Sequence, residues 1–287
     1  MAPRVLILTA SVGEGHDLPA RTLAAQLREE CPGIDVVTEN SLPALGRVVS
    51  AVSADAPRLV FFRFQVVWDL GFWLFARFAP TRRLTQSLMT RFASPGLLAL
   101  IAERDPDVIV SVYPNVTEVV GRLRQAGKID VPVVAAITDL AAMRYWATPG
   151  ADLHLITHEE SLEEVREVAG EDAAVHAVHG FTMPAFLEPR GSADARAALG
   201  LDQEGKLVVV SGGGWGVGDI VGAVEESLRV DGVTQVVCLC GRNEDLRERL
   251  LQRFDSEPRV RIEGFTEQMP DWLAAADVLV HSTGGLT

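Results

Sequence analysis

The stretch VLILTASVGEGHDLPARTLAAQL, residues 5–27, decides the fold of this chain. It opens with an apolar run typical of a buried strand, passes through a turn that contains two glycines, and continues with apolar residues at helical spacing. These helical positions are Ala20, Leu23, Ala24 and Leu27. A strand that leads directly into a helix predicts a βα unit, and such units build parallel sheets covered by helices on both faces.

The same alternation recurs along the chain. Further strand-like runs cover Ile34–Thr38, Val108–Val112, Val133–Thr138, Leu207–Ser211, Gln235–Cys240, Val260–Ile262 and Val278–His281. The series is interrupted at residues 180–205, where prolines and glycines stand in a stretch without strand character. We therefore expect an α/β protein with two doubly wound Rossmann-like domains that face a cleft, over residues 1–183 and 206–287, joined by a linker at 184–205.

Composition and charge exclude several classes of protein. The chain has 287 residues, of which 48% are hydrophobic and 23% charged, as is typical of a globular protein with room for two domains. Its formal net charge of −13 argues against nucleic acid as a partner, because phosphates bind basic surfaces. Three cysteines cannot form a disulfide framework, and no secretory signal precedes the first strand, so we expect a cytoplasmic protein.

One segment departs from this alternation, and we expect it to face a membrane over about residues 59–92. The run LVFFRFQVVWDLGFWLFARFA, residues 59–79, is rich in aromatic residues, but charges interrupt it too often for it to span a bilayer. From Leu70 to Ala102 the chain has four arginines and no acidic residue. As an interfacial surface, the segment would contact anionic lipid through Trp73, Arg77, Arg82 and Arg83. The alternative is a buried helix pair whose arginines extend to solvent.

The turn in the opening stretch allows another interpretation. Gly13 and Gly15 after a strand match the first half of the dinucleotide-binding fingerprint, but Leu18 stands in place of its third glycine. A leucine there would hold the helix away from a pyrophosphate. A NAD-dependent oxidoreductase therefore stays an alternative.

A richer glycine turn lies in VVVSGGGWGVGDI, residues 208–220, where five glycines fall within seven residues and lead into a helix. Glycine lets backbone N–H groups approach a ligand closely, and a helix N-terminus favours an anion. The next strand ends in CGRN, residues 240–243, and the last one in HSTGG, residues 281–285. Because parallel strands end at the same edge of a sheet, the sequence predicts a ligand crevice at this edge.

Two side chains are candidates for proton transfer. His16 lies at the start of the helix after the first strand, and Asp139 follows the strand at 133–138. At the carboxyl edge of the first sheet, the histidine could accept a proton near neutral pH, with the aspartate as its orienter or as an alternative base. A histidine at a helix start can equally be a capping or surface residue. No cluster of His, Cys and carboxylate residues has metal-ligand spacing, so we expect no metal.

Seven motifs together resemble the monogalactosyldiacylglycerol synthase and processive diacylglycerol glycosyltransferase family. Its members are GT-B enzymes of glycosyltransferase family 28, related to the N-acetylglucosaminyltransferase that forms lipid II. The motifs are ASVGEGH, DPDVIVSVYP, AITDL, VVVSGGGWGVGDI, VCLCGRNEDL, RIEGFTEQMPDWLAAADVLV and HSTGGLT.

The resemblance implies an activity in glycolipid biosynthesis. A hexose, which is glucose, galactose or N-acetylglucosamine, would pass with inversion from a UDP-sugar to the hydroxyl of a lipid such as diacylglycerol. The same resemblance implies that neither a cofactor nor a metal is required. It further implies a peripheral protein on the inner face of the cell membrane. Its partners would then be the UDP-sugar, the lipid acceptor and the anionic membrane surface.

Position within these motifs implies roles for individual residues. On the acceptor side the resemblance places Gly13, Gly15 and Tyr113, and His16 matches the family histidine proposed to act on the acceptor. Phe265 and Met269 match the segment that contacts uracil. The implied donor-binding residues are Gly212, Gly213, Gly214, Gly216, Gly241, Arg242, Asn243, Phe265, Met269, Gly284, Gly285 and Thr287.

Two departures from the family bear on these roles. Tyr113 in SVYP replaces a histidine common in the family, and the family histidine shortly after the TDL turn appears as Met143 or Arg144. The chain also ends at Thr287, inside a family motif, so the resemblance implies a truncated donor domain. We expect the 287-residue chain to be weakly active or inactive alone. A non-catalytic nucleotide- or lipid-binding remnant therefore stays a second alternative.

Overall fold

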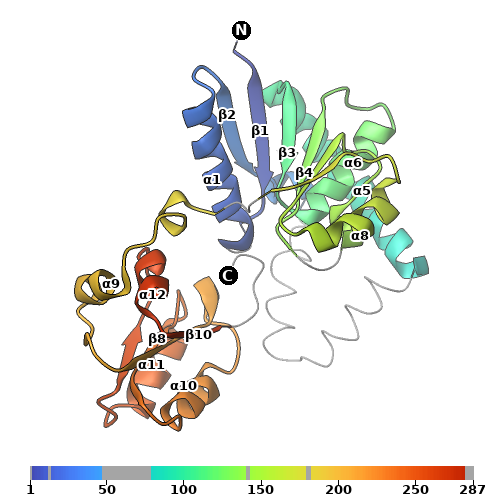
Figure 1. The fold of residues 1–287 in the computed structure, drawn as a ribbon. Coiled ribbons are helices and arrows are strands. Elements are labelled where there is room, and N and C mark those ends of the chain that lie inside the picture. The colour runs from blue at the N-terminus through green and yellow to red at the C-terminus, as the bar shows by residue number, and fades with distance from the viewer. Residues whose placement is uncertain (1, 12–13, 47–78, 140–142, 179–181, 282–287) are drawn as a thin grey trace. The chain divides into compact units, whose positions relative to one another are not determined.

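The chain forms two compact units, Met1–Thr182 and Met183–Gly285 (Figure 1). The structure, a computed structural model, describes residues 2–11, 14–46, 79–139, 143–178 and 182–281. Each unit is built around its own parallel sheet, as the alternation of strands and helices predicts.

The first unit contains a six-stranded sheet in the order β2-β1-β3-β4-β5-β6, in which every pair of neighbours is parallel. The strands are β1 Arg4–Thr9, β2 Asp35–Asn40, β3 Val108–Ser111, β4 Val133–Ala136, β5 Leu153–Ile156 and β6 Val175–Ala177. Because β1 lies inside the sheet, all but its first residue are buried. The strands at 153–156 and 175–177 are additional to those predicted.

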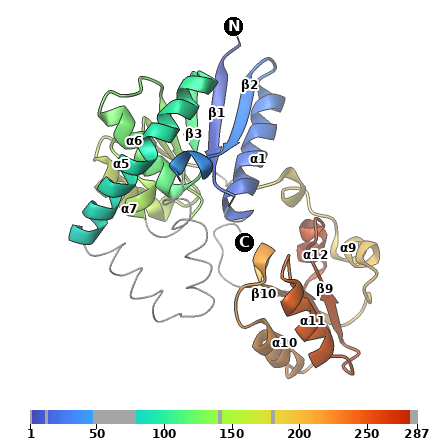
Figure 2. The same ribbon diagram turned by 180° about the vertical axis from the view of Figure 1, so that it is seen from behind.

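Helices cover both faces of this sheet (Figures 1 and 2). Along β1, Val5 and Ile7 belong to the core cluster under α1, whereas Leu6 and Leu8 belong to the cluster on the opposite face, with α5 and α6. This division follows from the two-residue period of a strand. The helices of the unit are α1 Glu14–Glu30, α5 Ala79–Arg104, α6 Pro114–Gln125, α7 Met143–Trp146 and α8 Leu162–Ala169, with short 3₁₀ turns at Pro43–Leu45 and Glu159–Ser161.

The second unit repeats the plan with a four-stranded parallel sheet in the order β10-β7-β8-β9. Its strands are β7 Lys206–Ser211, β8 Val233–Leu239, β9 Val260–Glu263 and β10 Val278–His281. One face packs against α10 and α11, the other against α9 and α12. These helices are α9 Ser192–Leu199, α10 Ile220–Leu228, α11 Glu244–Arg253 and α12 Met269–Ala275, with 3₁₀ turns at Pro184–Phe186 and Gly213–Trp215.

The expected linker at 184–205 needs correction, because α9 belongs to the second unit. The side chains of Ala195 and Leu199 are buried in its core. Between them, Arg196 donates from Nε to the carbonyl of Ala275 over 3.0 Å and from Nη2 to Asp277 Oδ2 over 2.7 Å. A helix fixed by a buried arginine is an integral part of the unit. The stretch has no strand character, as predicted, but it is not a free connection.

The expected membrane-facing segment is described only from residue 79 onward. Residues 59–78, with Trp73 and Arg77, lie outside the described residues. Within the described part of the chain, no helix has the length and apolar character that crossing a membrane requires.

Candidate active site

Three candidate residues of the first unit follow neighbouring strands of its sheet. His16 lies on α1 after β1, Tyr113 precedes α6 after β3, and Asp139 lies in the segment after β4. Because β1, β3 and β4 are adjacent and parallel, their carboxyl ends meet at the same edge. The positions predicted from sequence therefore converge.

The imidazole of His16 is packed between two aromatic rings. The Tyr113 ring meets it edge-on, with centroids 5.0 Å apart, and the Trp146 ring lies tilted at 5.9 Å. The Nδ1 atom of His16 is enclosed and has no hydrogen-bond partner among the described residues. The aromatic rings thus separate much of the imidazole from solvent.

This environment favours the neutral form of the imidazole. Burial lowers the pKa of His16, and this effect outweighs the charge of Asp139, a backbone hydrogen bond of Val112 and the charge of Asp17, all of which raise it. A neutral imidazole can accept a proton, and the Asp139 carboxylate would stabilise the imidazolium that results.

Asp139 is itself held by a residue that the sequence analysis did not single out. The indole Nε1 of Trp146 donates a hydrogen bond of 3.0 Å to Asp139 Oδ2. Trp146 is the last residue of α7, the short helix that also carries Met143 and Arg144. The only signal in the sequence was its place shortly after the AITDL motif, because the contact itself depends on how α7 packs.

Gly15, the glycine of the first turn that the structure describes, has no visible steric role. Gly13 lies outside the described residues. A Cβ added to Gly15 would meet no atom within 4 Å, and the backbone there is not left-handed. The described structure therefore gives no folding reason for glycine at position 15.

In the second unit, the glycine turn after β7 packs directly against the turn after β8. A Cβ on Gly216 would lie 2.6 Å from the carbonyl oxygen of Cys240, and one on Gly241 would lie 2.4 Å from that of Gly213. A backbone hydrogen bond of 2.8 Å from Arg242 N to the Gly214 carbonyl joins the two turns. Part of the glycine excess therefore serves this backbone contact.

Two helix N-termini at this edge are already capped by side chains of the chain. Asp219 accepts a hydrogen bond of 3.0 Å from Gly222 N at the start of α10, and Asn243 accepts one of 2.9 Å from Leu246 N at the start of α11. Because the Asp219 carboxylate already occupies the N-terminus of α10, that helix end attracts an anion less than the sequence suggested. The predicted donor residue Asn243 has a structural role as a cap.

The remaining residues predicted to bind the donor lie in the loop and helix after β9, next to these turns, or lie outside the described residues. The guanidinium of Arg242 lies over the ring of Phe265, in the loop after β9, with Cζ 3.7 Å from the ring centroid. Met269 begins α12 and packs against the core of the unit. Gly284, Gly285 and Thr287 lie outside the described residues. No group of three His, Cys, Asp or Glu side chains that could hold a metal is found in the described ranges.

Two helix-covered parallel sheets of Rossmann type are the architecture of the GT-B fold. MurG from Acinetobacter baumannii aligns with a TM-score of 0.55 and 14% identity over 99% of this chain and 74% of MurG. HepE from Anabaena, in complex with UDP and glucose, aligns with a TM-score of 0.50 and 14% identity over 98% of this chain and 74% of HepE. These similarities establish the fold.

Within this class, the chain belongs to the monogalactosyldiacylglycerol (MGDG) synthase family, whose model matches residues 16–180. It is also similar to the processive diacylglycerol β-glucosyltransferase of Staphylococcus aureus, with 23% identity over 99% of this chain and 71% of that protein.

Proposed function

We propose that this protein is an inverting glycosyltransferase that moves a hexose from a UDP-sugar to the hydroxyl group of a lipid such as diacylglycerol. The observation that carries the proposal is the His16 imidazole, packed between the Tyr113 and Trp146 rings, whose pKa is lowered by burial and raised by the charge of the Asp139 carboxylate. Family membership supports the reaction class, and the Staphylococcus aureus relative acts on diacylglycerol by its name.

In the proposed mechanism, His16 accepts the proton of the acceptor hydroxyl while its oxygen attacks the anomeric carbon. The bond from that carbon to the diphosphate breaks, and UDP leaves with the electron pair. A single displacement of this kind inverts the configuration. Asp139 stabilises the imidazolium until it passes the proton to solvent.

The donor would bind at the two facing turns of the second unit. The complex of HepE with UDP and glucose supports a nucleotide ligand for this fold. Gly212–Gly216 would lie against the diphosphate. In the described structure the N–H groups of Gly212, Gly213 and Gly216 already donate to the Leu239 carbonyl, Ser211 Oγ and the Gly213 carbonyl, so the turn would have to release them to bind the anion. In this proposal Phe265 contacts the uracil end, and Arg242, stacked on its ring, stabilises the departing negative charge without a cofactor.

We also propose that the outer face of α5 rests on an anionic membrane surface. Leu84, Leu88 and Phe92 follow one another at four-residue intervals, and their side chains are exposed by 59%, 44% and 58%. Arg83 and Arg91, each one position before an apolar residue of this row, are exposed as well. A row of exposed apolar residues flanked by arginines fits the interface of an anionic bilayer.

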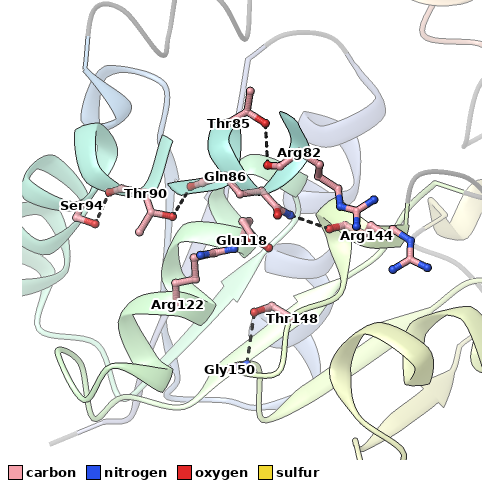
Figure 3. A network of polar contacts seen from close by, with 10 residues as sticks. All are labelled: Arg82, Thr85, Gln86, Thr90, Ser94, Glu118, Arg122, Arg144, Thr148 and Gly150. Carbon is pink, nitrogen blue, oxygen red and sulfur yellow. Dashed lines mark hydrogen bonds and ion pairs between the residues drawn. The ribbon is translucent and has the colours of Figure 1, made fainter. Parts of the chain in front are cut away.

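Arg82 differs from Arg83. It is half-buried, and its charge acts on the buried Glu118 carboxyl of α6, whose pKa burial raises and whose ion-pair partner is Arg122. Figure 3 shows the Arg82 side chain of α5 and the Glu118 and Arg122 side chains of α6. We therefore assign the membrane contact of the described residues to Arg83 and the apolar row, not to Arg82.

Ligand binding and a single substitution test the proposal. UDP or a UDP-sugar at about 100 times its dissociation constant should raise the free energy of unfolding by about 2.7 kcal/mol. His16→Ala should abolish transfer of the hexose to diacylglycerol while the dissociation constant of UDP stays within about twofold. Stabilisation by NAD and not by UDP would contradict the proposal, as would full transfer activity in the variant.

A further inference from the structure

One side chain contacts both candidate catalytic residues. The indole of Trp146 donates its N–H to Asp139 Oδ2 over 3.0 Å, and the ring lies 5.9 Å from the His16 ring. Trp146 is 1% exposed, so the indole is enclosed on nearly every side.

We propose that Trp146 is a positioning residue, which holds the Asp139 carboxylate beside His16 through its indole N–H. This inference rests on the proposed function, in which His16 is the base and Asp139 its orienter. Trp146 touches no reacting atom in this scheme. It acts through Asp139.

The position of the indole is fixed from two directions. Its ring belongs to a core cluster with Ala135 and Ile137 of the strand side and Val165 of α8. On the other side, Gln86 of α5 donates from Nε2 to the carbonyl of Arg144 over 3.2 Å, which ties α7 to α5 (Figure 3). A buried ring on an anchored helix offers its N–H in one direction only.

Without the hydrogen bond from the indole N–H, the Asp139 carboxylate can rotate away from His16. Its carboxylate is half-buried and can exchange the indole for water, as an exposed carboxylate does. Two carboxylates act on His16, namely Asp139 and Asp17, together with the Tyr113 and Trp146 rings. Asp17 is held independently, because Thr9 Oγ1 donates to its Oδ1 over 2.9 Å. Removing the indole N–H therefore changes only the contribution of Asp139.

The direction of the effect follows from the charge. The Asp139 carboxylate raises the pKa of His16, so its withdrawal lowers that pKa further. The acid limb of kcat/KM reports this ionisation in the free enzyme, and it should move to lower pH. The rate should fall as well, because the imidazolium loses its stabilising charge.

Two variants of Trp146 test the proposal in the full chain. Trp146→Phe removes the N–H and part of the ring, whereas replacement by benzothienylalanine removes only the N–H and keeps the ring shape. Both should lower kcat/KM about tenfold. The benzothienylalanine variant, which keeps the ring that buries His16, should also lower the pKa of His16 in an NMR titration of the ligand-free protein. Trp146→Phe in an Asp139→Asn background should add little, because both changes remove the same interaction.

Tyr145→Phe is the matched control. Tyr145 lies next to Trp146 on α7, and its hydroxyl has a hydrogen bond with Thr85, so the variant also loses one hydrogen bond from this helix. It should leave both the pKa of His16 and the pH profile in place. The proposal is overturned if the benzothienyl variant keeps the wild-type pKa of His16 and the wild-type profile. If the wild-type chain itself transfers no hexose, the kinetic comparison does not bear on the proposed function, and the NMR titration of His16 alone decides whether Trp146 positions Asp139.

Discussion

The guanidinium of Arg242 is stacked on the ring of Phe265, with its Cζ atom 3.7 Å from the ring centroid. The pair joins the turn after β8 to the loop after β9, at the edge where a nucleotide is proposed to bind. Phe265 remains 45% exposed, so the stacked pair presents an aromatic surface at this edge. Pairs of this kind contribute about 0.5–2 kcal/mol, and the ring can also stack on a base.

We predict that Arg242→Gln weakens UDP binding about tenfold, because both the stacking partner and a positive charge near the diphosphate are lost. Calorimetric titration with UDP measures the change. Arg261→Gln is the matched control, since Arg261 also lies over an aromatic ring of this unit, that of Trp272 at 5.4 Å, but donates to the Leu199 carbonyl of α9. Equal losses of affinity in both variants would contradict a donor role for Arg242.

Glycine substitutions should separate folding from binding at the two turns. A Cβ on Gly216 would lie 2.6 Å from a carbonyl oxygen, at a left-handed φ of +60°, so Gly216→Ala should reduce the free energy of unfolding by more than about 2 kcal/mol. Gly213 also has a left-handed φ, +67°, but a Cβ there would meet no atom within 4 Å. Gly213→Ala should cost only about 1–2 kcal/mol from backbone strain.

Gly213→Ala, the variant with the smaller loss of stability, should instead lose affinity for UDP. Gly213→Ala places a methyl group in open space where the donor is proposed to lie, so we expect UDP binding to weaken about tenfold in a protein that still folds. Chemical denaturation and UDP titration together check this. Wild-type affinity in Gly213→Ala would exclude close approach of the diphosphate at this position.

Most of the fold could be predicted because its signal is local. All eight predicted strands are present, each with ends within two residues of the prediction, since most of them lie in apolar runs between turns. The two additional strands, β5 and β6, have four and three residues, and histidines interrupt them: His154 and His176. With a histidine inside each run, these strands carry little apolar periodicity, and their strand conformation depends on pairing with a sheet that already exists.

The candidate site could be predicted only in part. His16, Tyr113 and Asp139 come together because each follows one of three adjacent parallel strands, and the alternation of strands and helices predicts that such strand ends meet at one edge. Trp146 could not be found in this way, since its contact with Asp139 depends on the tertiary packing of a four-residue helix. The carboxylate cap at Asp219 was not predicted, and it reduces the role expected for that helix end.

A buried histidine away from the site should make stability depend on pH. His154 on β5 is 0% exposed, and its Nε2 accepts a hydrogen bond of 3.3 Å from Thr148 N. Burial lowers its pKa below the ordinary value of about 6.5, as it does for His16. The unfolded chain therefore takes up protons at a pH where the folded protein does not.

The free energy of unfolding should be highest above about pH 6.5 and fall as the pH decreases, with a slope of at most about 1.4 kcal/mol per pH unit for each histidine. His154→Gln keeps a side-chain acceptor but removes the titration, so its slope should be smaller than that of the wild type. His16→Gln should remove the other contribution. Urea unfolding between pH 5 and pH 8 measures the slopes, and a wild-type slope in His154→Gln would contradict this account.

The outer face of α5 gives the last prediction. If this face rests on a membrane, both its arginines and its apolar row should contribute to membrane binding, and only the contribution of the arginines should weaken at high salt concentration. A basic residue near an anionic surface contributes about 1 kcal/mol, or about fivefold in binding, and this contribution is screened at high ionic strength. Charge reversal in Arg83→Glu/Arg91→Glu should therefore reduce binding to anionic vesicles at least about 25-fold at low salt. Phe92→Ser should reduce binding at both salt concentrations, because burial of its ring does not depend on charge.

Arg166→Glu/Arg249→Glu is the control, since it changes the charge equally at exposed positions of α8 and α11. Vesicle sedimentation measures all three variants, and an equal loss in the two charge-reversal pairs would mean that the net charge of the protein, not the α5 face, governs membrane binding.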